Sequence, residues 1–272
     1  MRIAGIRRAP EDSPNMSDKD NMLLEQVAKK LQARGHSVEI LDAAPTKKHD
    51  ALFHMSRTPA MLEQLARHEK DGAYVTNSVR GVLNCSRENF TNILEQEGIK
   101  QAPYRLITPT TAVETLQYPG WLKNAEGWSC TADDVQYIAD ASKLTDALKR
   151  LLAKGTEKAL YCEHIQGDIV KFYGIDEDSF FRLYYPNPDA TKFGLEKING
   201  TPQRYTFSQE KLREKAFAAA QAIGIEIFGG DCIVTATGEI FIIDFNDFPS
   251  FSACRDEAAE SIAALIERKA QR

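Results

Sequence analysis

The stretch from Gly224 to Phe251, GIEIFGGDCIVTATGEIFIIDFNDFPSF, constrains the fold of this chain more than any other part of it. Two segments in it, 231–235 and 239–245, are rich in Ile, Val, Phe and Cys, as buried strands are. The Thr237-Gly238 pair between them is a turn signal. The pattern therefore predicts a strand, a tight turn and a returning strand, which together form a β-hairpin.

The hairpin brings three oxygen-bearing side chains together. If residues 237 and 238 form a two-residue loop, counting outward along the strands puts Asp231 directly opposite Asp244. Opposed like charges at a cross-strand spacing of roughly 4.5–5.5 Å repel, so such a pair usually shares a proton or binds a cation. Asn246 follows Asp244 by two residues and projects from the same face. Two carboxylates and an amide oxygen suit Mg²⁺, which keeps its other positions for water and phosphate oxygens.

A plainer interpretation of the same residues stays open. Asp244 and Asn246 also fit the end of a strand and the start of a turn before Pro249. A loop one residue longer would turn the side chains of one strand to the other face, so the spacing alone does not decide between the two interpretations.

The segment 229–251, GGDCIVTATGEIFIIDFNDFPSF, resembles the end of the ATP-grasp fold. In that superfamily an acidic residue in a G-x-D strand and a later D-x-N turn before proline hold Mg²⁺ on the phosphates of ATP. The resemblance assigns these roles to Asp231, Asp244 and Asn246, and it extends more weakly over nearly the whole chain. It implies an α/β protein with an N-terminal parallel α/β lobe and two α+β lobes that clasp ATP, as in glutathione synthetase-like members. We expect these three lobes at residues 1–100, 101–165 and 166–272.

Composition sets the outer limits. A chain of 272 residues is long enough for two or three lobes, and 43% hydrophobic with 27% charged residues is ordinary for a globular protein. No apolar run approaches the roughly 20 residues that cross a bilayer, and the first residues carry no secretion signal, so we expect a cytoplasmic protein that binds no membrane. The net charge of −5 argues against general nucleic-acid binding. Five scattered cysteines without a C-x-x-C pair fit reduced thiols, and we expect a monomer or a homodimer.

The first hundred residues alternate between short apolar strands and helices. Strands are expected at 2–8, 37–41, 51–55 and 73–76, and helices at about 18–34, 59–69 and 87–97. This alternation indicates a parallel sheet, in which ligands bind beyond the carboxyl ends of the strands. Arg7 and Arg8 at one such strand end form a plausible anion clamp for a substrate. The other candidates in this lobe are Ser13, Asn15, Ser56 and Arg57, and each of them fits a solvated loop residue equally well.

Four basic positions match the part of the ATP-grasp fold that faces the phosphates. Many members have a lysine near the start of the helix that leads into the central lobe, and this chain has Arg87 there. The resemblance assigns Lys123 to the ATP phosphates and Lys171 to the transferred phosphate or the substrate. Arg182, in the alternating segment FFRLYY, continues this basic face. A lysine at a strand edge is more often only solvated, so spacing alone does not assign Lys123.

The segment 159–165, ALYCEHI, resembles the hinge strand whose backbone binds adenine in ATP-grasp proteins. The residues that the resemblance assigns to ATP here are Cys162, Glu163, His164, Ile165 and Asp168. Two of them, Glu163 and Asp168, match the carboxylates that hold the ribose hydroxyls. Ordinary turn or edge carboxylates are the simpler interpretation for these two, and a packed hinge residue is the simpler one for His164.

The last third of the chain adds candidates for substrate contact. A proline-rich loop is expected at 185–204, a helix at 208–223 and an amphipathic helix at the end of the chain. Ser250, Ser252 and Arg255 follow the hairpin directly and are expected to lie next to its metal site. Arg255 fits an ion pair with nearby acids equally well.

Together these features favour an ATP- and Mg²⁺-dependent ligase that joins a carboxylate to an amine through an acylphosphate, on a small molecule or a peptide. Phosphoryl transfer depends mainly on positioning and charge neutralisation, so the chemistry needs no nucleophilic triad. Two alternatives stay open. IFGGDCIV, IIDFNDFPSF and DIVKFYG also resemble ATP-grasp inositol phosphate kinases, and the missing helix lysine is consistent with a nucleotide-binding protein without turnover.

Overall fold

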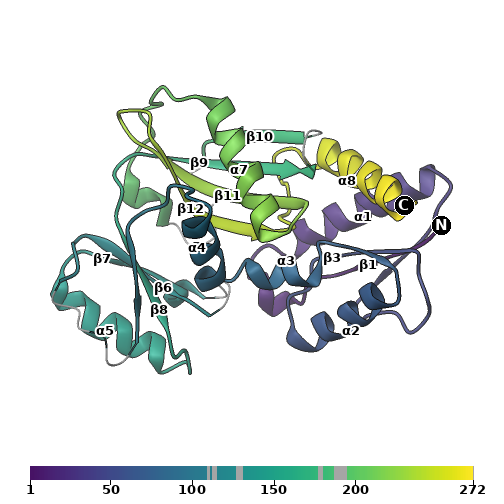
Figure 1. Cartoon of the computed structure of the whole chain (residues 1–272), viewed down its shortest axis with the longest axis horizontal. Helices are drawn as coiled ribbons and strands as arrows, with labels where there is room; N and C mark the ends of the chain where they lie inside the picture. The colour runs from purple at the N-terminus through teal and green to yellow at the C-terminus, as the bar shows by residue number, and fades with distance from the viewer. Residues whose placement is uncertain (109–110, 112–114, 127–130, 177–179, 187–194, 272) are drawn as a thin grey trace.

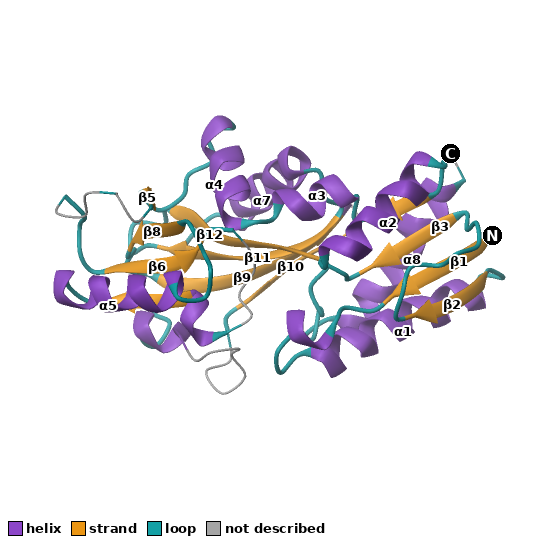
Figure 2. Cartoon of the chain, turned by 90° about the horizontal axis from the view of Figure 1, so that it is seen from below, coloured by secondary structure: helices purple, strands orange, loops and turns teal. Residues whose placement is uncertain are grey.

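The computed structural model of the chain describes all residues except 109–110, 112–114, 127–130, 177–179, 187–194 and 272. Its described strands form three four-stranded sheets. One sheet is parallel and belongs to the first part of the chain, and the other two are antiparallel. The sheets lie roughly in a row, with the sheet of the carboxyl-terminal part in the middle (Figure 2). This mixed α/β architecture confirms the predicted fold class.

The N-terminal lobe is built on a parallel sheet of order β2-β1-β3-β4. Its elements are β1 (Arg2–Ile6), the 3-10 turn η1 (Pro10–Asp12), α1 (Ser17–Ala33), β2 (Ser37–Leu41), β3 (Ala51–His54), α2 (Pro59–Lys70) and β4 (Tyr74–Thr76). They match the expected ranges closely because the apolar residues recur at the period of each element. α2 begins on a proline, whose fixed φ suits the first helical position.

The lobe also contains a short helix that the sequence analysis does not predict, α3 (Val79–Asn84). Ser78 caps this helix by accepting a hydrogen bond from the Gly81 backbone N–H. A helix of six residues is too short to display a helical period in its sequence, so the cap was its only signal.

The central lobe is an antiparallel sheet of order β5-β8-β6-β7 with one helix packed on it. Its elements are β5 (Tyr104–Ile107), β6 (Gly120–Asn124), the 3-10 turn η2 (Ala132–Asp134), β7 (Val135–Ile138), α5 (Ala141–Leu152) and β8 (Ala159–Glu163). α5 buries Leu144, Ala147 and Leu151, which are spaced to lie on one helical face. β5 was not predicted, because only four residues pair with the edge of β8.

The C-terminal lobe holds the predicted hairpin in an antiparallel sheet of order β10-β9-β11-β12. Its elements are β9 (Asp168–Ile175), β10 (Phe180–Tyr184), η3 (Leu195–Asn199), α7 (Gln209–Ile223), β11 (Ile227–Val234), β12 (Ile240–Asp247) and α8 (Arg255–Ala270). α7 and α4 (Arg87–Gln96) cover one face of this sheet, where Phe90, Leu212 and Phe245 share a buried cluster (Figure 2).

The last helix joins the two ends of the chain. α8 packs along α1 of the N-terminal lobe, and the buried cluster between them includes Leu24, Val27, Ile262 and Ile266 (Figure 1). The N-terminal and C-terminal lobes therefore share one hydrophobic core, which fixes their strand ends relative to each other.

The hairpin places Asp231 opposite Asp244, as the sequence predicts, but not by the expected route. The turn is one residue longer than assumed, because Thr235 N–H donates to the Glu239 carbonyl across a three-residue loop. Gly238 ends the loop with φ of +78°, a conformation that favours glycine.

A β-bulge in β12 restores the register. Cys232 pairs with Ile242 and Asp231 with Asp244, so Ile243 is the extra residue between two paired positions. The longer loop alone would have turned Asp244 away from Asp231, and the bulge compensates by one residue. The two carboxylates consequently face each other as a cross-strand pair.

Candidate active site at the junction of the three lobes

A cavity of about 360 Å³ lies where the three lobes meet, and its wall takes residues from all three of them. Of the predicted site residues, those that line it are Arg8, Arg87, Lys123, Cys162, Glu163, Ile165, Lys171, Asp231, Asp244, Asn246 and Ser250. Ser13 and Arg57, weighed as weaker candidates, line it as well. Side chains from more than 200 residues apart in sequence thus meet in one space.

The hairpin carboxylates form the floor of this cavity. Asp231 on β11 stands between Asp244 on β12 and Lys171 on β9. The Lys171 ammonium lies 3.1 Å from both Asp231 carboxylate oxygens. Asn246 donates its amide N–H to Asp244 Oδ2 at 3.1 Å. With its nitrogen facing Asp244, the Asn246 amide offers its Oδ1 as a further acceptor. Asp231, Asp244 and Asn246 thus bring three oxygen-bearing groups close to the Lys171 ammonium.

Positive charges surround Asp244 from two other lobes. Burial by itself raises the pKa of Asp244, but the charges of Arg87 and Lys123, the Asn246 hydrogen bond and Lys171 outweigh it and hold the pKa below its ordinary value. Arg87 donates to the Asn124 carbonyl at 3.0 Å, which ties the start of α4 to the central lobe. Asp244 is therefore ionised at neutral pH and available to a cation.

Lys123 makes a contact that depends on the bulge. Its ammonium donates to the Ile243 carbonyl at 3.0 Å, and Ile243 is the bulged residue of β12. A bulge interrupts the ladder locally, so this carbonyl is turned toward the cavity rather than toward a neighbouring strand. The contact holds a central-lobe lysine next to the carboxylates of the C-terminal lobe.

The donor set fits a magnesium ion that is shared with phosphates. Among the described residues no three His, Cys, Asp or Glu side chains gather in a metal-binding group, so the protein alone offers no closed cage. Mg²⁺ in phosphate-transfer sites characteristically takes one or two carboxylates and fills its remaining positions with phosphate oxygens and water. The opposed pair Asp231 and Asp244 with the Asn246 amide matches that requirement.

Three strands supply the apolar part of the cavity. Leu160 and Cys162 of β8 line it together with Ile165, Ile169 of β9 and Val135 of β7. Burial raises the pKa of the Cys162 thiol, against the opposing charges of Lys123 and Arg87, so the thiol is protonated at neutral pH. An apolar wall of this kind suits the flat adenine ring of a nucleotide.

His164 and Asp168, both predicted at the nucleotide, serve the framework instead of lining the cavity. His164 accepts a hydrogen bond from the Trp121 indole at 3.1 Å, and its backbone N–H donates to the Pro119 carbonyl. Asp168 is buried and accepts the backbone N–H groups of Gln203 and Tyr205 at 2.7 and 2.9 Å. It therefore orders the end of the predicted 185–204 loop and the residue that follows it, whereas residues 187–194 of that loop lie outside the described residues.

Six further basic or polar residues that the sequence singles out lie away from the cavity wall: Arg7, Asn15, Ser56, Arg182, Ser252 and Arg255. Arg182 forms an exposed ion pair with Glu257, and Arg7 pairs with Asp42. Asn15 sits in a left-handed turn with φ of 63°, and Arg255 is the first residue of α8. Of the Arg7-Arg8 clamp, the structure brings only Arg8 into the cavity.

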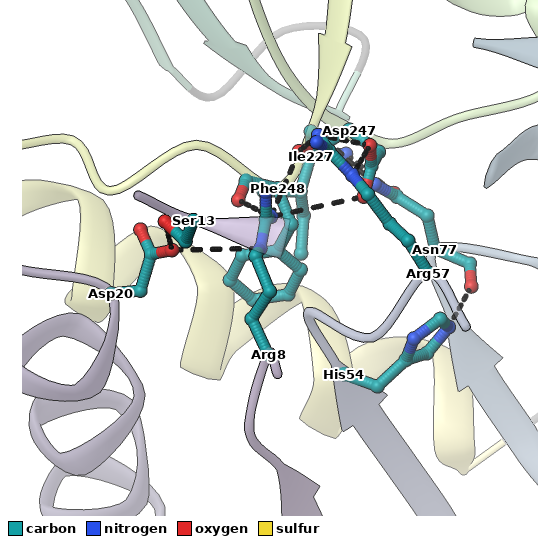
Figure 3. A network of polar contacts seen from close by, with 9 residues as sticks. All are labelled: Arg8, Ser13, Asp20, His54, Arg57, Asn77, Ile227, Asp247 and Phe248. Carbon is teal, nitrogen blue, oxygen red and sulfur yellow. Dashed lines mark hydrogen bonds and ion pairs between the residues drawn. The ribbon is translucent and has the colours of Figure 1, made fainter. Parts of the chain in front are cut away.

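The N-terminal lobe and the end of β12 contribute a buried polar network to the cavity wall (Figure 3). Arg57 donates Nε to Asp247 Oδ1 at 2.8 Å. Arg8 donates to the Phe248 carbonyl at 2.9 Å, and its Nε lies 3.5 Å from Asp20, which also accepts from Ser13 at 2.7 Å. Every one of these side chains is more than nine-tenths buried. Both arginines of this wall are already paired with acids, so it is not a free anion clamp.

Sequence reasoning missed the acidic half of this network. Asp247 follows Asn246 directly in the DFND tetrapeptide, and Asp20 lies in the first turn of α1. Burial raises the pKa of Asp247, but the charges of Arg57 and Arg8 outweigh this and hold it below its ordinary value. The only signal in the sequence was that Asp247 is an acidic residue directly after Asp244 and Asn246, two of the proposed metal ligands.

Comparison with solved structures defines the fold. The chain superposes on D-alanine–D-alanine ligase from Bacillus anthracis with a TM-score of 0.73 and 14% identity, over 100% of this chain and 99% of that one. It is similar to the ATP-grasp ligase PsnB, solved with minimal precursor, Mg and ADP, with a TM-score of 0.67 and 16% identity, over 99% and 98% of the two chains. The D-alanine–D-alanine ligase from Coxiella burnetii matches with a TM-score of 0.71 and 10% identity, over 100% and 97%.

The chain therefore has the ATP-grasp fold over its whole length, which confirms the fold that the resemblance of the hairpin segment implies. No protein-family model matches the sequence. Within the part of the chain that the structure describes, no helix is both long and apolar enough to cross a membrane.

Proposed function

We propose that this protein is an ATP- and Mg²⁺-dependent ligase that joins a carboxylate to an amine through an acylphosphate. The observation that carries the proposal is the cavity floor, where Asp231, Asp244 and Asn246 face Lys123 and Lys171. The similar solved structures add support, since one is a D-alanine–D-alanine ligase complexed with ATP and another is an ATP-grasp ligase with Mg and ADP.

The cavity offers each part of ATP a chemically suitable wall. The hinge residues Cys162 and Ile165 border the apolar slot for the base, and Glu163 is the carboxylate beside it that suits the ribose hydroxyls. The phosphates would meet Lys123 and Arg87. Asp231, Asp244 and Asn246 would hold Mg²⁺, which would supply positive charge to neutralise the phosphates and to orient the terminal phosphoryl group.

The reaction that these groups support has two steps. In the first, a substrate carboxylate oxygen attacks the terminal phosphorus, the bond from that phosphorus to the bridging oxygen breaks, and ADP leaves. In the second, an amine nitrogen attacks the acyl carbon, the bond from that carbon to the phosphate oxygen breaks, and inorganic phosphate and a proton are released. Lys123 and Lys171 stabilise the charge that spreads over the transferred group.

The substrate would face the wall built by Arg8, Ser13 and Ser250, because these polar residues line the same cavity from other elements than β8. The test is the balance of products with Mg²⁺-ATP and pools of amino acids, peptides and polar metabolites. The ligase predicts equal amounts of ADP and inorganic phosphate that depend on both a carboxylate and an amine. ADP without matching free phosphate would overturn the ligase and establish a kinase, and ATP binding without any ADP would establish a binding protein.

A further inference from the structure

The N-terminal lobe forms hydrogen bonds with both strands of the β11–β12 hairpin, at the end of the hairpin that lies away from its turn (Figure 3). The Asn77 side chain donates to the Ile227 carbonyl at 2.7 Å and accepts the Ile227 backbone N–H at 2.9 Å, which holds the start of β11. Arg8 donates to the Phe248 carbonyl at 2.9 Å, just past the end of β12. Each strand of the hairpin is thus tied to a loop of another lobe.

The strongest of these ties is the ion pair between Arg57 and Asp247. Arg57 Nε and Nη2 lie 2.8 and 2.6 Å from Asp247 Oδ1. The two side chains are 6% and 1% exposed, so water screens the pair very little. Arg57 Nη2 also donates to the Asp247 backbone carbonyl at 3.4 Å, and the guanidinium therefore holds the main chain as well as the side chain.

This pair acts on the residue next to a proposed metal ligand. Asp247 follows Asn246, and both residues line the cavity. Directly beyond them, Phe248 has φ of +36°, so the chain turns sharply out of the strand in a left-handed conformation. The end of this backbone is fixed by its ladder to β11, where the Phe248 N–H donates to the Ile227 carbonyl at 3.0 Å, and by the contacts of Arg57 and Arg8 from the N-terminal lobe.

We propose that Arg57 and Asp247 are positioning residues for the metal–nucleotide complex. The inference rests on the proposed function, and it adds that the N-terminal lobe sets the position of the metal ligands in the C-terminal lobe. Neither residue needs to touch the metal or the phosphates. A side chain that binds a metal has to be held within roughly 0.5 Å of its productive position. Contacts to the residues next to that side chain provide this precision.

A purely structural ion pair between the same lobes gives the contrast. Arg34, directly after α1, pairs with Glu260 and Glu267 on α8. The side chains of Arg34 and Glu260 are 26% and 51% exposed. It joins the N-terminal lobe to the last helix, as Arg57 joins that lobe to β12. None of its three side chains lines the cavity, so we expect its loss to weaken the lobe contact without moving the hairpin.

The test is titration of the whole protein with a non-hydrolysable ATP analogue, by calorimetry, with and without Mn²⁺. Two double variants are compared with the parent: Arg57→Gln with Asp247→Asn, and the control Arg34→Gln with Glu260→Gln. Each removes both charges of one pair, so that no unpaired charge stays buried and the variants fold. Thermal unfolding without ligands reports folding separately.

The expected result is a loss of Mn²⁺-dependent analogue affinity by roughly 10-fold to 100-fold in the Arg57/Asp247 variant, with metal-free affinity unchanged and the control like the parent. Equal Mn²⁺-dependent affinity in parent and Arg57/Asp247 variant would overturn the inference, as would an equal loss with and without metal. The single variant Arg57→Lys keeps the positive charge but loses the forked guanidinium. Its Mn²⁺-dependent affinity for the analogue should lie between that of the parent and that of the double variant. If the parent itself binds the analogue no better with Mn²⁺, the proposed function fails together with this inference.

Discussion

Replacing Lys123 by methionine tests the charge arrangement of the cavity. The ammonium of Lys123 lies beside the proposed phosphate site, and an ammonium about 4 Å from a phosphate charge gains roughly 4 kcal/mol at an effective dielectric constant of about 20. In the ligand-free protein the ammonium donates to the Ile243 carbonyl at 3.0 Å, and giving up such a hydrogen bond costs about 1 kcal/mol. The difference of about 3 kcal/mol corresponds to a loss of roughly 100-fold in kcat/KM for Mg²⁺-ATP.

The assay is ADP release at varied Mg²⁺-ATP, with Lys158→Met as the matched control. Lys158 also ties the central lobe to α4, through an ion pair of 2.8 Å with Glu88, but it does not line the cavity. The control should therefore keep the parent kcat/KM within a few-fold. The reasoning is refuted if Lys123→Met also keeps it, or if both variants lose activity in proportion to a fall in thermal stability.

Three further predictions concern the cavity walls. Asp247→Ala leaves Arg57 with an uncompensated buried charge and should cost roughly 3–5 kcal/mol of unfolding free energy, measured by urea denaturation. Because the pKa of Asp247 is lowered in the folded state, its contribution should be complete above about pH 4 and lost as the pH falls further; a loss between pH 6 and 8 would contradict this. Since burial raises the pKa of Cys162, iodoacetamide should label it more slowly than a free thiol at pH 7, and saturating ATP should slow it again; ATP-insensitive labelling would exclude it from the nucleotide wall. Gly229→Ala would put a Cβ 2.8 Å from the ring of Tyr173, so it should lower thermal stability and Mg²⁺-ATP affinity together, and unchanged values would show that the ring moves freely.

The hairpin shows what the local sequence pattern predicts correctly and what it does not predict. Asp231 and Asp244 pair as predicted, yet the prediction assumed a two-residue turn, whereas the real turn has three residues and a bulge at Ile243 that cancels the difference. The apolar composition predicted the strands, but no feature of the sequence predicted the bulge. A bulged residue differs from its neighbours in backbone geometry and not in amino-acid type.

The predicted basic residues also differ in how well the local sequence pattern placed them. Lys123 and Lys171 sit on strands whose period fixes which face they occupy, and both line the cavity. Arg182 also sits on a strand, but β10 is the outer strand of its sheet and its arginine pairs with Glu257 of α8. Sheet order is a property of the assembled lobes, so the sequence alone could not place Arg182 at the edge.

Contacts between lobes were the least predictable feature. The pair Arg57 and Asp247 joins residues 190 positions apart, and each residue alone looks like an ordinary loop or strand-end charge. The packing of α8 on α1 is a further case, since an amphipathic pattern predicts that a helix has a buried face but not which element covers it.

The most direct test of the central claim is magnesium-dependent turnover in the variant Asp244→Ala with Asn246→Ala. If these residues and Asp231 hold Mg²⁺ on ATP, the variant should lose ADP formation at all Mg²⁺ concentrations while keeping the parent's fold by circular dichroism. Magnesium-dependent ADP formation at the parent rate would contradict the account, because the metal would then bind elsewhere.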